Sequence, residues 1–244
     1  MSLDFIEAPS PNFDARNKVP DMLVLHYTGM QTGEAALERL RDDSRPGKVS
    51  SHYLVEEDGR IFRLVPEERR AWHAGQSFWR GEDQLNHASI GIEIVNPGHE
   101  FGYRAFPDAQ IAAVIALVGD IRTRWTIDDN RILGHSDIAP GRKVDPGELF
   151  PWKRLAEAGH GVWAEAASAP GQALAEGDEG VGVFALQAGL TRLGYDSAPS
   201  GQFDAKTKDI VAAFQQHWVQ SRWDGVADGQ TRATLMAVLR AAAD

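Results

Sequence analysis

The chain contains no cysteine, which excludes disulfide bonds and thiolate metal ligands. A metal site would therefore have to use histidine, aspartate or glutamate side chains. Long apolar runs are also lacking, and none approaches the roughly 20 residues that a membrane-spanning helix needs. Basic residues are scarce, because 25 lysines and arginines stand against 35 aspartates and glutamates. With a net charge of -10, the chain lacks the basic surface that neutralises phosphates, so no nucleic-acid partner is expected.

The first residues, MSLDFIEAPSPNFDAR, lack the basic start and the apolar middle of a secretory signal peptide. The sequence as written therefore predicts a cytoplasmic protein, whereas a chain trimmed at its natural start is compatible with a periplasmic or cell-wall location. The 244 residues, of which 43% are hydrophobic, suffice for one large or two small globular domains. A monomer is expected.

Residues 20–155 mix short apolar segments with amphipathic ones. MLVLHYTG (22–29) and RILGH (131–135) are typical of buried strands. SIGIEIVN (89–96) alternates, so its isoleucines share one face and Glu93 lies on the other. SHYLVEEDGRIFRLVP (51–66) predicts a hairpin that turns at an Asp-Gly pair. The sequence therefore predicts an α/β (α+β) domain, with a mixed central sheet flanked by helices.

Two of the flanking helices have recognisable starts. Residues 32–43 carry apolar side chains on one face, with Thr32 as the candidate N-cap. Residues 108–125 show the strongest helical periodicity, and Asp108 is the candidate cap after Pro107.

Composition changes after residue 156. Residues 157–180 are rich in alanine, glycine and serine and predict a linker. Residues 181–244 predict a small three-helix domain, whose last two helices begin at Asp204 and Asp228 in a weak internal repeat. A core of this size is marginal by itself. The predicted organisation is thus a mixed α/β domain at 1–156, a linker at 157–180, and a small helical domain at 181–244.

Three residues of the first domain are candidate metal ligands. His26 and His135 each end an apolar strand, and Asp145 lies ten residues later in GHSDIAPGRKVDPG (134–147). Two imidazoles and one carboxylate leave a fourth position for water, as in catalytic zinc sites. Zn²⁺ lowers the pKa of bound water from 15.7 to about 7 and so supplies hydroxide at neutral pH. The prolines and glycines of the loop would limit its backbone freedom around Asp145.

Two charged residues are candidates for catalysis. Glu93 lies in an apolar strand, where an unpaired carboxylate is unusual, and it is placed to act as a general base. Lys143 precedes Asp145 by two residues, so the two side chains would share one side of an extended loop, and its ammonium group is placed to stabilise an oxyanion. Asp137 is interpreted as a structural residue that bonds nearby backbone amides.

Each of these residues also has an ordinary structural interpretation. A histidine at a strand end can be a hydrogen-bonded structural group, and Glu93 can pair with an arginine. Lys143 can be a solvated surface residue, and the Asp-Pro-Gly that begins at Asp145 can be a simple turn. Spacing alone leaves the hydrolytic and the structural interpretations open.

Four longer segments narrow the choice: VLHYTG, SHYLVEEDGRIFRLVPEERRAWHAG, NHASIGIEIVN and GHSDIAPGRKVDPG. In this order and spacing, residues 20–155 resemble the type 2 N-acetylmuramoyl-L-alanine amidases, which share a fold with the peptidoglycan recognition proteins. The resemblance implies zinc bound by His26, His135 and Asp145. It also implies Glu93 as the catalytic base and Lys143 as its electrostatic partner.

The same resemblance suggests where muropeptide binds. RAWHAG is expected to line the groove, so Trp72 and His73 are candidate substrate-binding residues, and residues 76–85 are candidates for stem-peptide or sugar preference. Residues 181–240 resemble the three-helix peptidoglycan-binding module. The implied function is zinc-dependent hydrolysis of the amide between the lactyl group of N-acetylmuramic acid, in its intact or 1,6-anhydro form, and L-alanine. A non-catalytic peptidoglycan-recognition protein and a zinc peptidase are the alternatives.

Overall fold

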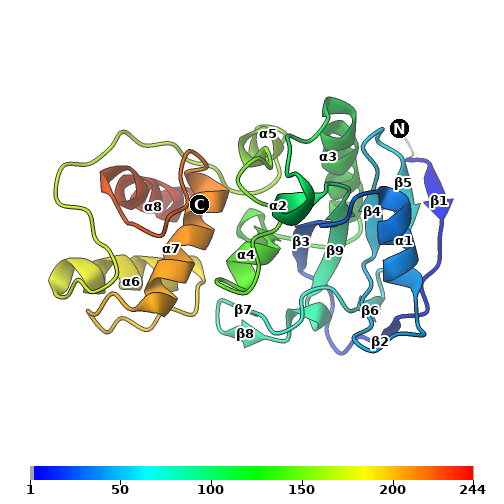
Figure 1. The fold of residues 1–244 in the computed structure, drawn as a ribbon, viewed down its shortest axis with the longest axis horizontal. Coiled ribbons are helices and arrows are strands. Elements are labelled where there is room, and N and C mark those ends of the chain that lie inside the picture. The colour runs from blue at the N-terminus through cyan, green and yellow to red at the C-terminus, as the bar shows by residue number, and fades with distance from the viewer. Residues whose placement is uncertain (1–2, 244) are drawn as a thin grey trace.

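A six-stranded mixed sheet forms the centre of the N-terminal part of the computed structural model, which describes residues 3–243 (Figure 1). The strand order is β1-β5-β4-β9-β3-β10, and every pair is parallel except β4 with β5. The strand bounds are β1 Phe5–Glu7, β3 Met22–Tyr27, β4 Tyr53–Val55, β5 Ile61–Arg63, β9 Ser89–Ile94 and β10 Ile132–Gly134. The predicted mixed sheet and the predicted hairpin within residues 51–66 are both confirmed.

Two small antiparallel pairs flank this sheet, and the sequence analysis did not predict either. One pairs β2 (Phe13–Ala15) with β6 (Arg69–Ala71). The other pairs β7 (Phe78–Trp79) with β8 (Glu82–Asp83), so residues 76–85 contain a short hairpin. Strands of two or three residues are too short to show an alternating pattern in the sequence.

Residues 3–160 contain five α-helices: α1 Gly33–Arg41, α2 Gly98–Phe101, α3 Asp108–Arg122, α4 His135–Ile138 and α5 Trp152–Glu157. Two short 3₁₀ helices lie at Leu85–His87 and Asp129–Arg131. The prediction for α1 is confirmed, because the Thr32 hydroxyl accepts the backbone N–H of Ala35 at 3.2 Å. The predicted cap of α3 is wrong. Pro107 is its N-cap, while Asp108 lies inside the first turn and pairs with Arg154 at 2.5 Å.

Alternation along β3 separates two cores. Leu23 and Leu25 join the apolar cluster that packs the sheet against α3 and α5. Met22 and Val24 point to the opposite face and join a different cluster. Because side chains alternate along a strand, His26 lies on the same face as Met22 and Val24, away from α3.

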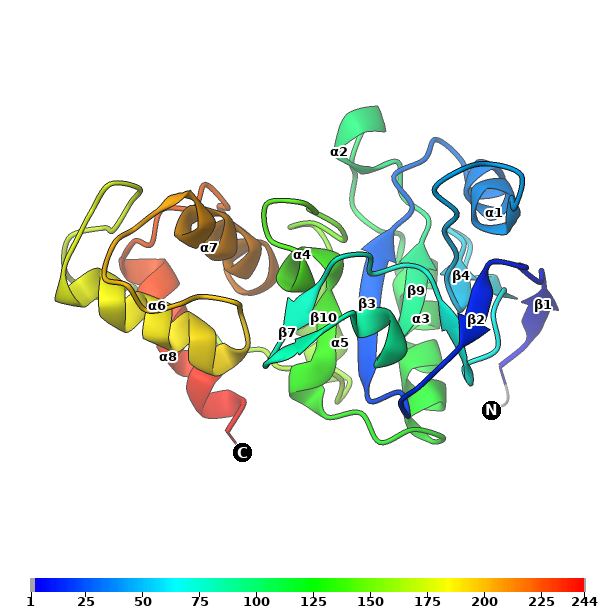
Figure 2. The ribbon, with the colours of Figure 1, turned by 90° about the horizontal axis from the view of Figure 1, so that it is seen from below.

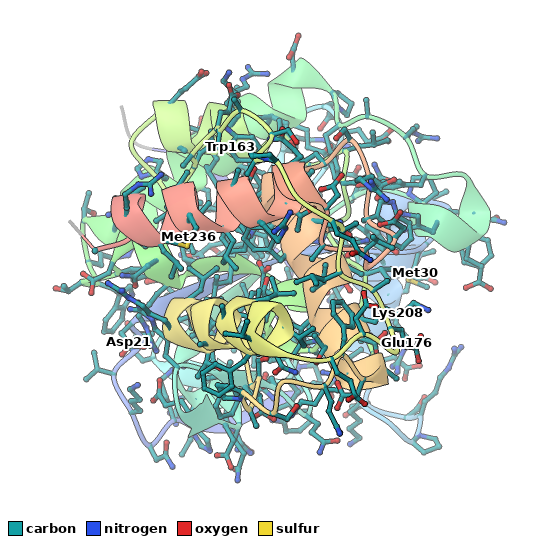
Figure 3. All side chains as sticks on the ribbon, turned by 90° about the vertical axis from the view of Figure 1, so that its left-hand side faces the viewer. Asp21, Met30, Trp163, Glu176, Lys208 and Met236 are labelled. Atoms are coloured by element: carbon teal, nitrogen blue, oxygen red, sulfur yellow. The ribbon has the colours of Figure 1, made fainter. Side chains whose placement is uncertain are left out.

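The C-terminal part consists of α6 (Val181–Leu193), α7 (Ala205–Trp218) and α8 (Gly229–Ala241), as predicted. Asp204 accepts the backbone N–H of Thr207, and Asp228 accepts that of Thr231, both at 2.8 Å, so the two predicted caps are confirmed. Figure 3 faces these helices, and Glu176 pairs there with Lys208 at 3.0 Å, which ties the preceding segment to α7.

The C-terminal helices share a core with the sheet. One apolar cluster contains Met22 and Val24 of β3, Leu133 of β10 and Ile138 of α4 together with buried residues of α6, α7 and α8. Figure 2 shows α7 directly beside α4. The sequence predicted a separate three-helix domain with a marginal core, whereas the structure joins the buried residues of these helices with those of β3, β10 and α4 in one cluster. Within residues 3–243, no helix combines the length and apolar character required to cross a membrane.

Candidate metal centre

The candidate site residues meet at the carboxyl ends of three neighbouring strands. β3 lies between β9 and β10, and all three run parallel. His26 of β3 is the register partner of Glu93 in β9. Gly134 of β10 is the partner of Leu25, so His135, the next residue, comes level with His26. The parallel register therefore explains why residues far apart in the sequence share one site.

His26, His135 and Asp145 form a compact buried cluster. Oδ2 of Asp145 lies 2.9 Å from Nδ1 of His26 and 3.1 Å from Nδ1 of His135, and the two Nδ1 atoms are 3.0 Å apart. The three residues are only 2%, 3% and 7% exposed. The backbone N–H of Ser136 donates to the carbonyl of Asp145 at 2.9 Å, which holds the loop against α4. Candidate ligand atoms of the three side chains all lie within 4.8 Å of one another.

The far side of each imidazole also has a hydrogen-bonding partner. Nε2 of His135 lies 3.1 Å from the carbonyl oxygen of Ala74, which can only accept, so this nitrogen carries the proton. In the neutral ring Nδ1 is then a bare acceptor facing the Asp145 carboxylate. Nε2 of His26 lies 3.1 Å from Nδ1 of His73. The two Nδ1 atoms and the Asp145 carboxylate thus converge, while each Nε2 atom has a partner on the far side of its ring. Metal-binding histidines in proteins usually have this arrangement.

The electrostatics of the cluster favour an ionised Asp145 carboxylate and a neutral His26 imidazole. Burial opposes the charge on Asp145, but His135 and His26 outweigh it and hold the pKa of the carboxyl well below its ordinary value. Burial, reinforced by His135, lowers the pKa of His26 to about 4. Neutral imidazole and carboxylate are the forms that bind metal ions.

Glu93 lies beside the cluster and is only partly exposed. Its Oε2 is buried and has no hydrogen-bond partner among the residues described. Burial, together with the negative charge of Asp145, raises the pKa of Glu93 well above its ordinary value, while Lys143 opposes this shift. A carboxyl group without a fixed partner, next to a metal cluster, is available to exchange a proton with a bound molecule.

One cavity of about 400 Å³ opens onto the cluster, and all seven residues singled out from the sequence line it. These are His26, Trp72, His73, Glu93, His135, Lys143 and Asp145. The loop that carries Lys143 is not extended throughout, because the backbone N–H groups of Arg142 and Lys143 both donate to the carbonyl of Ala139. Lys143 and Asp145 nevertheless contribute to the same cavity.

His73 contacts the side of the His26 ring that faces away from Asp145 and His135. The residue is 8% exposed, its Nδ1 contacts His26, and its Nε2 lies 3.3 Å from the hydroxyl of Ser89. Gly91 makes room for it, since a Cβ atom there would lie 2.5 Å from Cγ of His73. His73 also lines the cavity, so the substrate contact that the resemblance implies for it stays a prediction. Trp72, by contrast, is partly exposed in the cavity.

Arg142 and Asp137 hold the loop and the turn next to the cluster, and the sequence predicted only part of this. The Arg142 guanidinium donates to the carbonyl oxygens of Ala74 and Gln76, and so fixes the loop beside the cluster. Asp137 accepts the backbone N–H of Gly134 at 2.8 Å, which confirms its predicted structural role. Its additional bonds to the C-terminal helices were not predicted, because their partners lie at least 58 residues away.

Two imidazoles and one carboxylate thus form a buried, cavity-facing candidate metal site at the carboxyl ends of the strands of a mixed sheet. Comparison with known families makes the assignment specific. The profile of the N-acetylmuramoyl-L-alanine amidase family matches residues 16–148, and that of a peptidoglycan binding domain matches residues 179–235. The chain belongs to the N-acetylmuramoyl-L-alanine amidase family, and the resemblance noted in the sequence is confirmed.

Individual relatives agree with this assignment. N-acetylmuramoyl-L-alanine amidase AmiD of Escherichia coli is 38% identical over 234 residues, which cover 89% of this chain and 82% of AmiD. 1,6-Anhydro-N-acetylmuramyl-L-alanine amidase AmpD of Citrobacter freundii is 34% identical over 164 residues, covering 60% of this chain and 86% of AmpD. The structure of AmiD with anhydro-N-acetylmuramic acid-L-Ala-D-γ-Glu-L-Lys superposes with a TM-score of 0.77, at 37% identity, over 93% of this chain and 92% of that one.

Proposed function

We propose that this protein is a zinc-dependent amidase that hydrolyses the bond between the lactyl group of N-acetylmuramic acid and the L-alanine of a peptidoglycan stem peptide. The observation that carries the proposal is the convergence of His26, His135 and Asp145 on one point beside Glu93, inside a single cavity. Membership of the amidase family supports the choice of reaction.

The donor set fits zinc. Two imidazole nitrogens and one carboxylate oxygen are its usual ligands in hydrolytic sites, which keep a further position open. The chain contains no cysteine that would favour a softer ion. When bound, zinc would polarise the lactyl carbonyl group and make water acidic enough to attack it at neutral pH.

The chain's own residues move the protons. Glu93 removes a proton from the attacking water as the water oxygen bonds to the carbonyl carbon. The same carboxyl group then delivers that proton to the L-alanine nitrogen as the carbon–nitrogen bond breaks. The products are a lactyl carboxylic acid and an otherwise intact stem peptide with a free amine. At neutral pH the acid loses the second proton of the water and the amine takes up a proton. Lys143, which lines the same cavity, stabilises the negative charge that develops on the former carbonyl oxygen.

The substrate is a muropeptide or a peptidoglycan strand. AmiD is seen with an anhydromuropeptide and AmpD is named for the 1,6-anhydro sugar, so we propose that this protein accepts the anhydro form. Trp72 offers an aromatic surface beside the reacting group. The C-terminal helices, which match a peptidoglycan binding domain, would raise the local concentration of wall substrate. We propose a monomer as the working unit.

Glu93→Gln and His135→Ala test the proposal when activity and metal content are measured together on a defined anhydromuropeptide. Glu93→Gln is expected to keep its zinc and to lose roughly 10²–10⁴-fold in kcat. His135→Ala is expected to lose both zinc and activity. Full activity in the metal-free wild-type protein would contradict the mechanism.

Product analysis separates the amidase from its alternatives. Mass spectrometry should show an intact stem peptide that begins with a free L-alanine amine. Cleavage within the stem would indicate a peptidase instead, and binding without any hydrolysis would indicate a recognition protein.

A further inference from the structure

One carboxylate connects the metal centre to the C-terminal helices. Asp137, two residues after His135, is 1% exposed. Its Oδ2 accepts the backbone N–H of Gly134 at 2.8 Å, which closes the first turn of α4. Its Oδ1 accepts the hydroxyl of Tyr195 at 2.7 Å, and Nδ1 of His217 lies 2.7 Å from Oδ2. Two side chains from the C-terminal part and the residue before a candidate ligand thus share one buried carboxylate.

Both C-terminal partners are held rigidly. The His217 imidazole is stacked between Trp152 at 3.7 Å and Trp218 at 3.6 Å, measured between ring centroids. The Tyr195 ring packs edge-on against Trp79 at 4.9 Å. Burial and the nearby carboxylate raise the pKa of Tyr195 well above its ordinary value, so its hydroxyl remains a donor. These aromatic contacts and the burial of both side chains restrict the directions in which they can donate.

The first turn of α4, which carries His135, packs closely against the loop that carries Asp145. A Cβ atom at Gly134 would lie 2.8 Å from the ring of Pro146, so the start of α4 is pressed against the residue that follows Asp145. Ser136, in the same turn, donates to the Asp145 carbonyl at 2.9 Å. The first turn of α4 consequently sets the backbone of His135 directly and that of Asp145 through one hydrogen bond.

We propose that Tyr195 and His217 are positioning residues for the metal centre, which hold Asp137 so that it fixes the turn carrying His135. The inference rests on the metal site of the proposed function. The C-terminal helices then complete the metal site, in addition to any role in holding the wall. Neither side chain lines the cavity that contains Glu93 and Lys143, so they act on the ligands and not on the substrate.

His217→Phe and Tyr195→Phe, made in the full-length chain, test this directly. His217→Phe keeps an aromatic ring between the two indoles but removes the donor to Asp137, and Tyr195→Phe removes one hydroxyl. Affinity for Zn²⁺ is measured without substrate, by competition with a chromophoric chelator. Loss of a direct hydrogen-bond partner of a metal ligand typically weakens metal binding about 10–100-fold. Because Tyr195 and His217 act through Asp137, we expect a loss at the lower end of this range, about tenfold, for both variants. With saturating Zn²⁺, kcat should fall while KM stays near the wild-type value.

Gln220→Met is the matched control, because it removes another contact between the two parts of the chain. Gln220 donates to the carbonyl oxygens of Glu148 and Phe150 at 2.9 and 2.6 Å and does not touch Asp137. It should lower the melting temperature but leave Zn²⁺ affinity within about twofold of wild type.

Three results would overturn the inference. They are wild-type Zn²⁺ affinity in folded His217→Phe and Tyr195→Phe, an equal loss of affinity in Gln220→Met, or a KM effect that accounts for the whole loss of activity. If His217→Phe does not fold, Tyr195→Phe decides alone, since it deletes a single oxygen atom. Wild-type protein that binds no Zn²⁺ would instead refute the proposed function, so the two failures can be told apart.

Discussion

Gly91→Ala is expected to weaken metal binding without altering any residue that touches the metal. The added Cβ would lie 2.5 Å from Cγ and 2.6 Å from Nδ1 of His73. Ordinary carbon–carbon contacts are about 3.5 Å or longer, so the ring must move by roughly 1 Å. It cannot turn aside freely, because it packs edge-on against both His26 and His52 at centroid distances of 5.1 and 5.7 Å. Overpacking of this kind costs about 1–3 kcal/mol of stability.

Movement of the His73 ring would also break its hydrogen bond to the candidate ligand His26. Nε2 of His26 and Nδ1 of His73 are 3.1 Å apart, and a shift of roughly 1 Å takes them beyond hydrogen-bond range. Without this partner His26 loses a restraint on its orientation, and zinc affinity should fall about 10–100-fold, or roughly 1.4–2.8 kcal/mol. Chelator competition measures the affinity, and thermal unfolding of the metal-free protein measures the strain.

Gly119→Ala provides the control for Gly91→Ala. Gly119 lies in α3, where a Cβ atom would be 3.3 Å from Nε2 of the partly exposed His160. Alanine is favoured over glycine in a helix by about 0.5–1 kcal/mol, so this variant should be as stable as wild type or more so, with unchanged zinc affinity. Wild-type zinc affinity in Gly91→Ala would refute the reasoning, because it would show that His73 does not restrain His26.

Other perturbations have equally specific outcomes. Glu67 is 7% exposed and accepts hydrogen bonds from Tyr53, Arg124 and Trp125, so Glu67→Gln should cost about 1–3 kcal/mol in denaturant unfolding at pH 7. Burial opposes ionisation of Glu67, but these bonds outweigh it and lower its pKa below 4.5. Its stabilisation is therefore complete above about pH 4.5 and is lost as the pH falls through the lowered value, so the two proteins should converge in acid. Asp228→Ala should cost about 1 kcal/mol, while Asp228→Asn, which keeps an acceptor for the helix, should cost less.

Much of the candidate site could be predicted from two features of the sequence. Apolar runs show where buried strands end, and the residue types at those ends show which side chains could bind a metal or transfer a proton. An apolar run that ends in histidine predicts a buried strand whose last side chain lies at the sheet edge, and this holds for His26. Alternation along SIGIEIVN placed Glu93 on the face opposite its isoleucines, and the register with β3 places it beside His26. The metal, its catalytic partners and their roles remain predictions until the variants are measured.

What escaped prediction depends on contacts between distant segments. The position of His73 is set by Gly91 on another strand, and the partners of Asp137 come from helices that fold against the first domain. The cap of α3 was assigned to Asp108 although Pro107 occupies it, since sequence alone does not show that the carboxylate pairs with Arg154. For His73 and Asp137, a contact between distant segments decides a position that the local pattern leaves open.

The apolar cluster that unites the sheet with α6, α7 and α8 affects how the protein unfolds. Met22, Val24 and Leu133 are each at most 1% exposed, and their cluster includes buried residues of the three C-terminal helices. A chain cut near residue 160 would expose these apolar side chains to water. The amidase part alone should therefore aggregate unless another apolar surface covers them. The intact protein should melt in a single cooperative transition, with calorimetric and van't Hoff enthalpies in agreement. Although two family profiles divide the sequence, the shared cluster predicts that both parts unfold together.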